Sequence, residues 1–146
     1  MSVHLPDANV LLALAWPQHV HHGPAHQWFR RAAAKGWATC PLTQLAFIRI
    51  SSNPKIVAEA VSPREARELL KEMLALAHHH FWPDDVQPIA AEGFASIALV
   101  GHRQVNDAYL VELAQRHEGK VATFDRGLTE LAGAMRGEKR VTLIEA

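Results

Sequence analysis

Apolar residues recur along the chain in two patterns: helical spacing over long stretches, and short uninterrupted runs. The clearest helical spacing follows Ser62-Pro63, where apolar residues at intervals of three and four positions continue to Ala77. Ser62 and Glu65 have the spacing of a capping box, with Pro63 at the first helical position. The short apolar runs are typical of buried strands.

These patterns predict strands that alternate with helices. Strands are expected just before Asp7 and at 37–40, 80–82, 120–125 and 140–144. Helices are expected at 8–15, 23–35, 43–52, 63–77, 89–99, 105–114 and 128–134. Such alternation is typical of a parallel sheet covered by helices on both faces. With 146 residues and neither a repeat nor a linker, the chain is expected to form a single domain over residues 1–146.

Charge and hydropathy narrow the function only slightly. The chain has 15 Lys and Arg residues and 15 Asp and Glu residues, so its bulk charge does not indicate a nucleic-acid-binding protein. A polyanion would need a local basic patch, for which the candidates are Arg30, Arg31, Lys35, Arg49 and Lys55. No apolar run approaches the roughly 18 residues of a membrane span, and no signal peptide is evident. We therefore expect a soluble protein of the cytoplasm.

The histidines, the lone cysteine and one pair of acids are weak candidates for chemistry. Two histidine groups, at 19–26 and 78–80, lack Cys or carboxylate partners at metal-site spacing, so we expect surface or helix-end packing. Cys40 has no partner for a disulfide and is expected to be a small buried apolar residue. Asp84 and Asp85 follow a proline and fit a turn better than a metal site.

Three other acids occupy positions that favour chemistry. Asp7 and Asp125 lie at the carboxyl ends of predicted strands, and Asp107 lies near the amino end of a predicted helix. Asp7 is also well placed to be an ordinary helix N-cap. If the first strand and the strand at 120–125 are neighbours, the three carboxylates converge at the edge of a parallel sheet where ligands bind. Clustered carboxylates repel one another unless a cation is present, and Mg²⁺ with phosphate chemistry suits such a site.

Four segments together resemble the successive motifs of PIN-domain ribonucleases, and the chain is most similar to VapC-type toxins of bacterial toxin–antitoxin systems. The segments are Leu5-Pro6-Asp7-Ala8-Asn9-Val10-Leu11, Pro41-Leu42-Thr43-Gln44-Leu45-Ala46-Phe47-Ile48-Arg49, Asn106-Asp107-Ala108-Tyr109-Leu110 and Thr123-Phe124-Asp125-Arg126-Gly127-Leu128. They occur in order and span nearly the full length. The resemblance implies a three-layer α/β/α fold with a central parallel sheet of about four to five strands.

The resemblance also implies an activity and partners. It predicts an endoribonuclease that depends on Mg²⁺ or Mn²⁺, and a cognate VapB-type antitoxin that blocks it. A homodimer is also expected. The N-terminal helices, rich in leucine, tryptophan and phenylalanine, offer either an antitoxin groove, a dimer surface or core packing.

Residue roles follow from the matched motifs. Asp7 and Asp107 would be the principal metal ligands, and Asp125 would complete the acidic pocket directly or through water. Thr123 and Asn9 would hold the carboxylates or a water in place. Arg49 would lie near the scissile phosphate as an electrostatic clamp.

One position departs from the family pattern. Where many PIN domains carry glutamate in the middle motif, this chain has Gln44, whose amide cannot act as a charged ligand or general base. This keeps open a second hypothesis, a catalytically impaired PIN-fold module that binds RNA or protein. A receiver domain or an aspartyl-phosphate phosphatase fits less well, because residues 1–6 contain no acid and Lys120 begins a strand rather than ending one.

Overall fold

The computed structural model describes residues 2–93, 101 and 104–146. Its strands are β1 (His4–Pro6), β2 (Trp37–Thr39), β3 (His79–Phe81), β4 (Lys120–Thr123) and β5 (Val141–Leu143). Its helices are α1 (Ala8–Ala15), α2 (His22–Ala32), α3 (Pro41–Ser51), α4 (Pro63–Leu74), α6 (Gln104–Arg116) and α7 (Arg126–Ala134), with short 3₁₀ turns at Ala33–Lys35 and Glu138–Arg140. In this part of the chain no helix is long and apolar enough to cross a membrane.

The strands form one parallel sheet in the order β3-β2-β1-β4-β5. β1 lies at its centre, with His4 in register with Trp37 on one side and with Lys120 on the other. The predicted neighbourhood of the first strand and the strand at 120–125 is confirmed, because β1 pairs directly with β4. Their carboxyl ends therefore meet at the same edge of the sheet.

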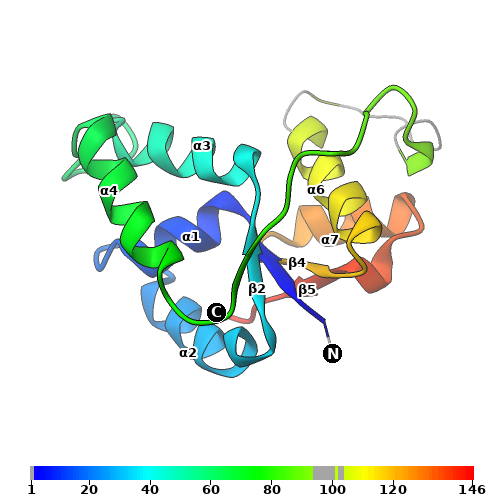
Figure 1. Ribbon diagram of the computed structural model, residues 1–146, viewed down its shortest axis with the longest axis horizontal. Coiled ribbons are helices and arrows are strands. Elements are labelled where there is room, and N and C mark those ends of the chain that lie inside the picture. The colour runs from blue at the N-terminus through cyan, green and yellow to red at the C-terminus, as the bar shows by residue number, and fades with distance from the viewer. Residues whose placement is uncertain (1, 94–100, 102–103) are drawn as a thin grey trace.

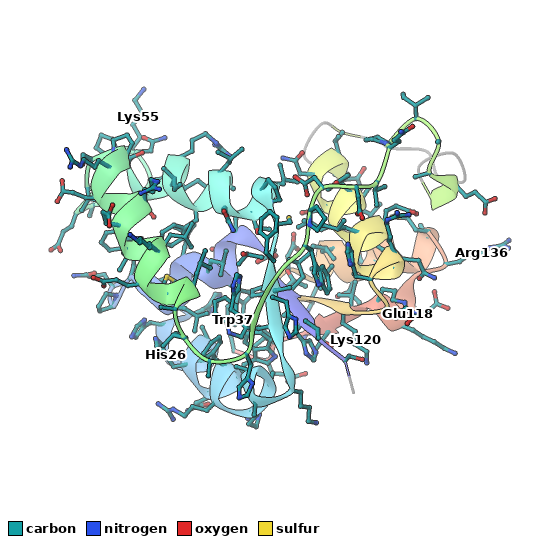
Figure 2. The ribbon with its side chains drawn as sticks, in the orientation of Figure 1. His26, Trp37, Lys55, Glu118, Lys120 and Arg136 are labelled. Carbon is teal, nitrogen blue, oxygen red and sulfur yellow. The ribbon has the colours of Figure 1, made fainter. Side chains whose placement is uncertain are left out.

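Helices cover both faces of the sheet, as predicted for a three-layer α/β/α fold. Figure 1 shows α6 and α7 on one side and α1 to α4 on the other. On the first side, Leu5 and Val121 pack against Leu113 and Leu128 in one apolar cluster. The opposite side holds two clusters, whose members include Val10, Trp28 and Ala122 in one, and Leu11, Trp37, Phe47 and Leu70 in the other. Figure 2 shows Trp37 in the interior, whereas Lys55 and Arg136 project at opposite ends of the molecule.

Several element ends differ from the sequence-based expectations for local reasons. The helix expected at 23–35 is α2 followed by the 3₁₀ turn, and the predicted stop at Gly36 is confirmed by a backbone φ of 107°. The helix expected from residue 43 begins two positions earlier, because Pro41 suits the first helical turn. The helix expected at 63–77 ends at Leu74. The helix expected at 89–99 lies largely outside the described residues.

A candidate active site at the carboxyl edge of the sheet

Asp7 connects the central strand to the first helix. It follows β1 and is the N-cap of α1, with its Oδ1 accepting a hydrogen bond from the Val10 amide at 3.0 Å. Its Oδ2 accepts a second bond from the Thr123 hydroxyl at 2.6 Å. Asp7 is therefore a helix cap, as considered from the sequence. Its carboxylate can still bind a further ligand, since an ionised carboxylate offers about four lone-pair positions.

Thr123 links two of the acids. It is the last residue of β4 and is fully buried. Its Oγ1 donates to Asp7 and accepts from the backbone amide of Asp125 at 3.0 Å. Asp125 in turn is the N-cap of α7 and accepts from the Gly127 amide at 2.8 Å. A single buried hydroxyl thus ties the carboxylate after β1 to the turn after β4.

The three predicted acids act on one another electrostatically. Burial raises the pKa of Asp7 to about 6, and the charge of Asp125 adds to this while hydrogen bonds from Thr123 and Val10 oppose it. The pKa of Asp107 is also raised to about 6, first by burial and then by the charges of Asp7 and Asp125. Asp107 lies in the first turn of α6. All three acids thus lie at amino ends of helices, where the helix dipole favours negative charge.

The donor set suits a hard cation that keeps part of its water shell. Carboxylate and hydroxyl oxygens are ligands of Mg²⁺ and Mn²⁺, whereas Zn²⁺ sites are usually built from Cys and His. Among the described residues no three His, Cys, Asp or Glu side chains form a preassembled cage. Mg²⁺ does not require one, because it is usually bound by one or two carboxylates together with waters and substrate phosphates.

The other predicted site residues are placed less uniformly. Asn9 donates its backbone amide to Asp7, while its side chain is hydrogen-bonded through Oδ1 to His19 at 2.9 Å. Gln44 lies in the first turn of α3, and its Nε2 donates to Thr39 Oγ1 at 2.9 Å. Arg49 is exposed in the last turn of α3. Within the described chain, no hydrogen bond joins Gln44 or Arg49 to the three acids.

Three of the five cations considered for a basic patch lie away from the acids. Arg30 and Arg31 lie in the last turn of α2, and Lys35 ends the 3₁₀ turn that precedes β2. Lys35 is close enough to the start of β1 that its charge contributes, after burial and Lys120, to lowering the pKa of His4. These cations therefore lie towards the amino edge of the sheet, opposite the acids. Their helix runs away from the site, a direction that the periodicity of α2 does not reveal.

Two features of the carboxyl edge were missed in the sequence. Arg126 begins α7 immediately after Asp125 and is exposed. The His21 ring, from the loop before α2, stacks on Phe124 with centroids 4.5 Å apart. Adjacency to Asp125 was a usable signal for Arg126. The stacking pair had no local signal, because it depends on how the loop at 17–21 returns to this edge.

Several of the weaker candidates, among the histidines, the cysteine and the pair of acids, have structural roles. His22 Nδ1 and His26 Nε2 bond to the Ala13 and Leu14 carbonyls, at 2.7 and 2.8 Å, which confirms helix-end packing for these two histidines. Cys40 is buried as expected. Asp84 accepts from the Leu42 amide at 3.1 Å at the start of α3, and Asp85 is paired with Arg116 at 3.0 Å.

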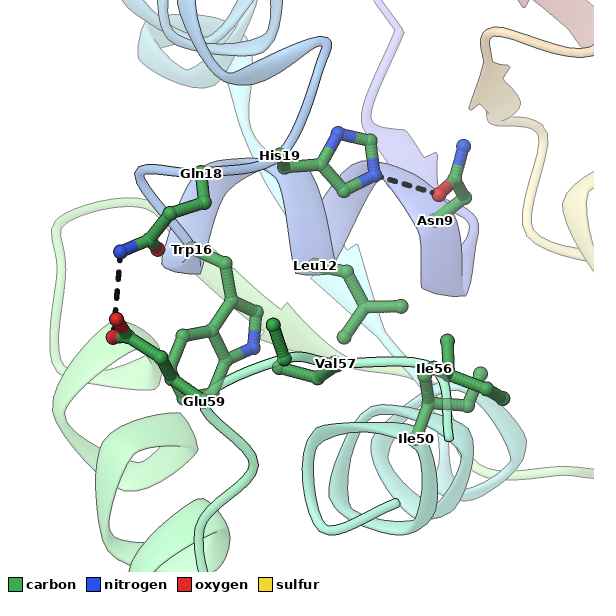
Figure 3. Close-up of a pocket in the computed structure, with 10 residues that line it drawn as sticks. Asn9, Leu12, Trp16, Gln18, His19, Ile50, Ile56, Val57 and Glu59 are labelled. Atoms are coloured by element: carbon green, nitrogen blue, oxygen red, sulfur yellow. Dashed lines mark hydrogen bonds between the residues drawn. The ribbon is translucent and has the colours of Figure 1, made fainter. Parts of the chain in front are cut away.

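A mainly apolar pocket lies beside α1 and reaches Asn9, two residues after Asp7. It has a volume of about 360 Å³ and is walled by Leu12, Trp16, Ile50, Ile56 and Val57 (Figure 3). A hydrogen bond from Gln18 to Glu59, at 3.3 Å, lies at one end, and Asn9 with His19 lies at the other. Its mainly apolar lining suits apolar groups better than phosphate.

Similarity to known proteins assigns the chain to a family. Residues 5–134 match the family model described as PIN domain. Ribonuclease VapC39 of Mycobacterium tuberculosis is 44% identical over 130 residues, covering 89% of this chain and 94% of the relative. Ribonucleases VapC38 and VapC29 of the same organism are 43% and 42% identical, over 88% of this chain and 89% and 90% of their own lengths. The chain therefore belongs to the PIN-domain family, among its VapC-type ribonucleases.

Proposed function

We propose that the protein is a divalent-metal-dependent endoribonuclease that hydrolyses RNA phosphodiester bonds. Asp7 and Asp107 would hold Mg²⁺ or Mn²⁺, with Asp125 completing the pocket. The observation that carries this proposal is the electrostatic convergence of the three acids, two of which have pKa values raised to about 6. A cation bound here would offset both the cost of burying charged carboxylates and their mutual repulsion.

The chain's own residues would prepare this site in distinct ways. Thr123 and the amino end of α1 fix the Asp7 carboxylate through its two oxygens. Arg126 places a positive charge at the rim, where it would attract the RNA backbone, and the Phe124–His21 stack offers a surface for a base. The bound cation would supply a nucleophile at neutral pH and stabilise charge on the phosphate.

We also propose a cognate VapB-type antitoxin as the regulatory partner, and that both proteins act in the cytoplasm. The apolar pocket beside α1 would accept apolar side chains of such a partner. A homodimer, expected from the resemblance, belongs to the same proposal. Size-exclusion chromatography with light scattering, of the chain alone and co-expressed with a candidate VapB-type antitoxin, tests both associations.

The decisive experiment compares the wild type with Asp7→Asn after induced expression, followed by mapping of new RNA ends. Growth arrest and new ends in the wild type alone would support the proposal and would name the substrate. Asp84→Asn serves as a control, because it removes a carboxylate that contacts the start of α3 and is not one of the three acids. This variant should cut RNA as the wild type does. Equal cleavage by the wild type and Asp7→Asn would refute the proposal.

The alternative is a module that binds RNA or protein without cutting. It is favoured by Gln44, whose amide replaces the usual acid and contacts Thr39 rather than a carboxylate of the pocket. Calorimetric titration with Mn²⁺ separates the two functions. Binding that Asp7→Asn and Asp107→Asn both abolish supports a metal-dependent enzyme, whereas absence of such binding supports the module.

A further inference from the structure

Gln44 is the first member of a chain of hydrogen bonds that runs away from the acids. Its Nε2 donates to Thr39 Oγ1 at 2.9 Å. The same Oγ1 lies 2.7 Å from Nε2 of His79, on the neighbouring strand β3. Thr39 is fully buried, whereas Gln44 and His79 are partly exposed. A buried hydroxyl therefore couples a partly exposed amide to a partly exposed imidazole.

The donors and acceptors of this chain determine one another. A hydroxyl has one hydrogen to donate, and Thr39 already accepts from Gln44. If His79 Nε2 carried a hydrogen, Thr39 would accept twice and its own buried hydrogen would lack an acceptor in these contacts, which is costly. These contacts therefore favour a neutral His79 with its hydrogen on Nδ1, so that Thr39 donates to Nε2.

The surroundings of His79 agree with this assignment. The Trp37 ring packs against the imidazole, with centroids 4.7 Å apart, and is itself uncharged. Burial lowers the pKa of His79, and the charge of the adjacent His80 lowers it further. β3 is an edge strand, and its paired strand β2 presents only Trp37, Ala38 and Thr39. No acid in the described part of the chain stabilises the protonated ring.

Gln44 lies at the carboxyl edge of the sheet, where the atom that its amide presents would affect cation binding. β2 is a parallel neighbour of β1, so α3, which follows β2, starts at the same carboxyl edge as Asp7. Gln44 is one helical turn beyond Cys40. The nitrogen of this amide donates to Thr39, and no residue that the structure describes is hydrogen-bonded to its Oε1, which is therefore an available acceptor and a dipole end that attracts cations.

We propose that Thr39 and His79 are positioning residues that determine which atom of the Gln44 amide is presented at the candidate site. With His79 neutral, the free atom is Oε1, which suits a hydrated cation. When His79 gains a proton, its Nε2–H donates to Thr39, the hydroxyl donates to Gln44, and the amide turns over to present its NH₂ group, which disfavours a cation. This inference rests on the proposed metal-dependent function, and it gives Gln44 a role that glutamate lacks, because a carboxylate presents oxygen in either orientation.

The tautomer of His79 provides a test that needs no activity. Long-range ¹H–¹⁵N correlation spectra of the metal-free protein distinguish Nδ1–H from Nε2–H, with exposed His80 as the internal control. We expect Nδ1–H at pH 8 in the wild type and in Thr39→Ser, which keeps the hydroxyl. In Gln44→Glu we expect Nε2–H and a higher His79 pKa, because the hydroxyl must then donate to the carboxylate. Nε2–H in the wild type, or no change in Gln44→Glu, would overturn the inference.

Cation affinity provides the second arm. Calorimetric titrations measure the affinity for Mn²⁺ above and below the pH at which His79 gains its proton. On lowering the pH, the wild type should lose about fivefold more affinity than Gln44→Glu, which is the effect of one hydrogen bond. Introduced into the wild type, Thr39→Val should abolish this extra loss of affinity, whereas Thr39→Ser should retain it. Parallel pH dependence in the wild type and Gln44→Glu would overturn the positioning role. Failure of Asp7→Asn to affect Mn²⁺ binding would instead refute the proposed function, and the tautomer result would be unaffected.

Discussion

Thr123 donates its hydroxyl hydrogen to the Asp7 carboxylate over 2.6 Å, although 116 positions separate the two residues in the chain. The contact exists because β1 and β4 are parallel neighbours, with Pro6 in register with Ala122. The hydroxyl is buried, so it has no water to compete for its hydrogen. The same oxygen accepts from the Asp125 amide, so the positions of two acids depend on one side chain.

Replacing Thr123 by valine should therefore reduce activity without removing a carboxylate. Loss of an outer contact that orients a metal-binding carboxylate typically costs 10–100-fold in metal affinity or activity, and we expect about that loss in RNA cleavage. Valine also leaves a buried carboxylate oxygen and the Asp125 amide without this partner, which should cost about 1–3 kcal/mol of stability. Thr123→Ser keeps the hydroxyl and should retain most activity. Equal losses in both variants would indicate that packing of the methyl group, not the hydrogen bond, is what matters.

Removing the charge of Asp107 should stabilise the metal-free protein. The pKa of Asp107 is raised from 3.8 to about 6, so the folded state holds the proton more tightly than the unfolded chain does. The charged carboxylate therefore destabilises the fold above that range, and stability declines as the pH rises from about 4 to 6. Asp107→Asn should be more stable than the wild type at pH 8 by about 1 kcal/mol, less than the full pKa shift implies, because solvent screens a partly exposed carboxylate. Urea unfolding at pH 8 and pH 4 measures this, and the difference should vanish at pH 4.

The same variant should be inactive, which separates stability from function. Residues that repel one another in the absence of a ligand are common at functional sites, where stability and activity conflict. A destabilised Asp107→Asn at pH 8 would show that the carboxylate makes favourable contacts that outweigh the repulsion.

Cation binding should restore the stability that the acids remove, and the effect should depend on pH. A ligand that binds only the folded state raises its stability, and a carboxylate must lose its proton before it binds a cation. Because Asp7 and Asp107 have pKa values near 6, thermal stabilisation by Mg²⁺ or Mn²⁺ should be small at pH 5 and large at pH 8. Differential scanning fluorimetry measures it, with Asp7→Asn as the control that should lose the pH 8 effect. Equal stabilisation of the wild type and this variant would place the cation elsewhere.

Local patterns predicted the elements well because their determinants lie within a few residues. The capping box at Ser62 and Glu65 is present with both hydrogen bonds, at 3.2 and 3.1 Å. A short apolar run followed by an acid and a helical pattern placed Asp7 directly after β1, whereas Asp125, predicted as the last residue of its strand, lies two residues beyond the end of β4. The ends of elements shifted by one to three residues where tertiary contacts or proline decided them.

Side-chain direction was the part that the sequence did not reveal. Asn9 is two positions from Asp7, yet its side chain contacts His19 on the returning loop. The nitrogen of Gln44 contacts Thr39, five positions earlier on a strand. Arg30 lies far from the acids because α2 runs towards the amino edge of the sheet. Each of these outcomes depends on where a loop or helix travels after it leaves the sheet, which hydrophobic periodicity does not encode.

Arg126, rather than Arg30, should contribute to RNA binding. Arg126 lies beside Asp125 at the carboxyl edge, whereas Arg30 ends a helix directed to the opposite edge. Each cation that contacts a single-stranded phosphate backbone contributes about 0.7 to the slope of log affinity against log salt. In an Asp7→Asn background, which should leave the RNA uncut, Arg126→Ala should weaken binding and reduce the slope by about that amount. Arg30→Ala removes the same charge from the same molecule and should leave both quantities unchanged. Fluorescence anisotropy across a salt series measures them, and a reduced slope in Arg30→Ala alone would place the RNA path along α2.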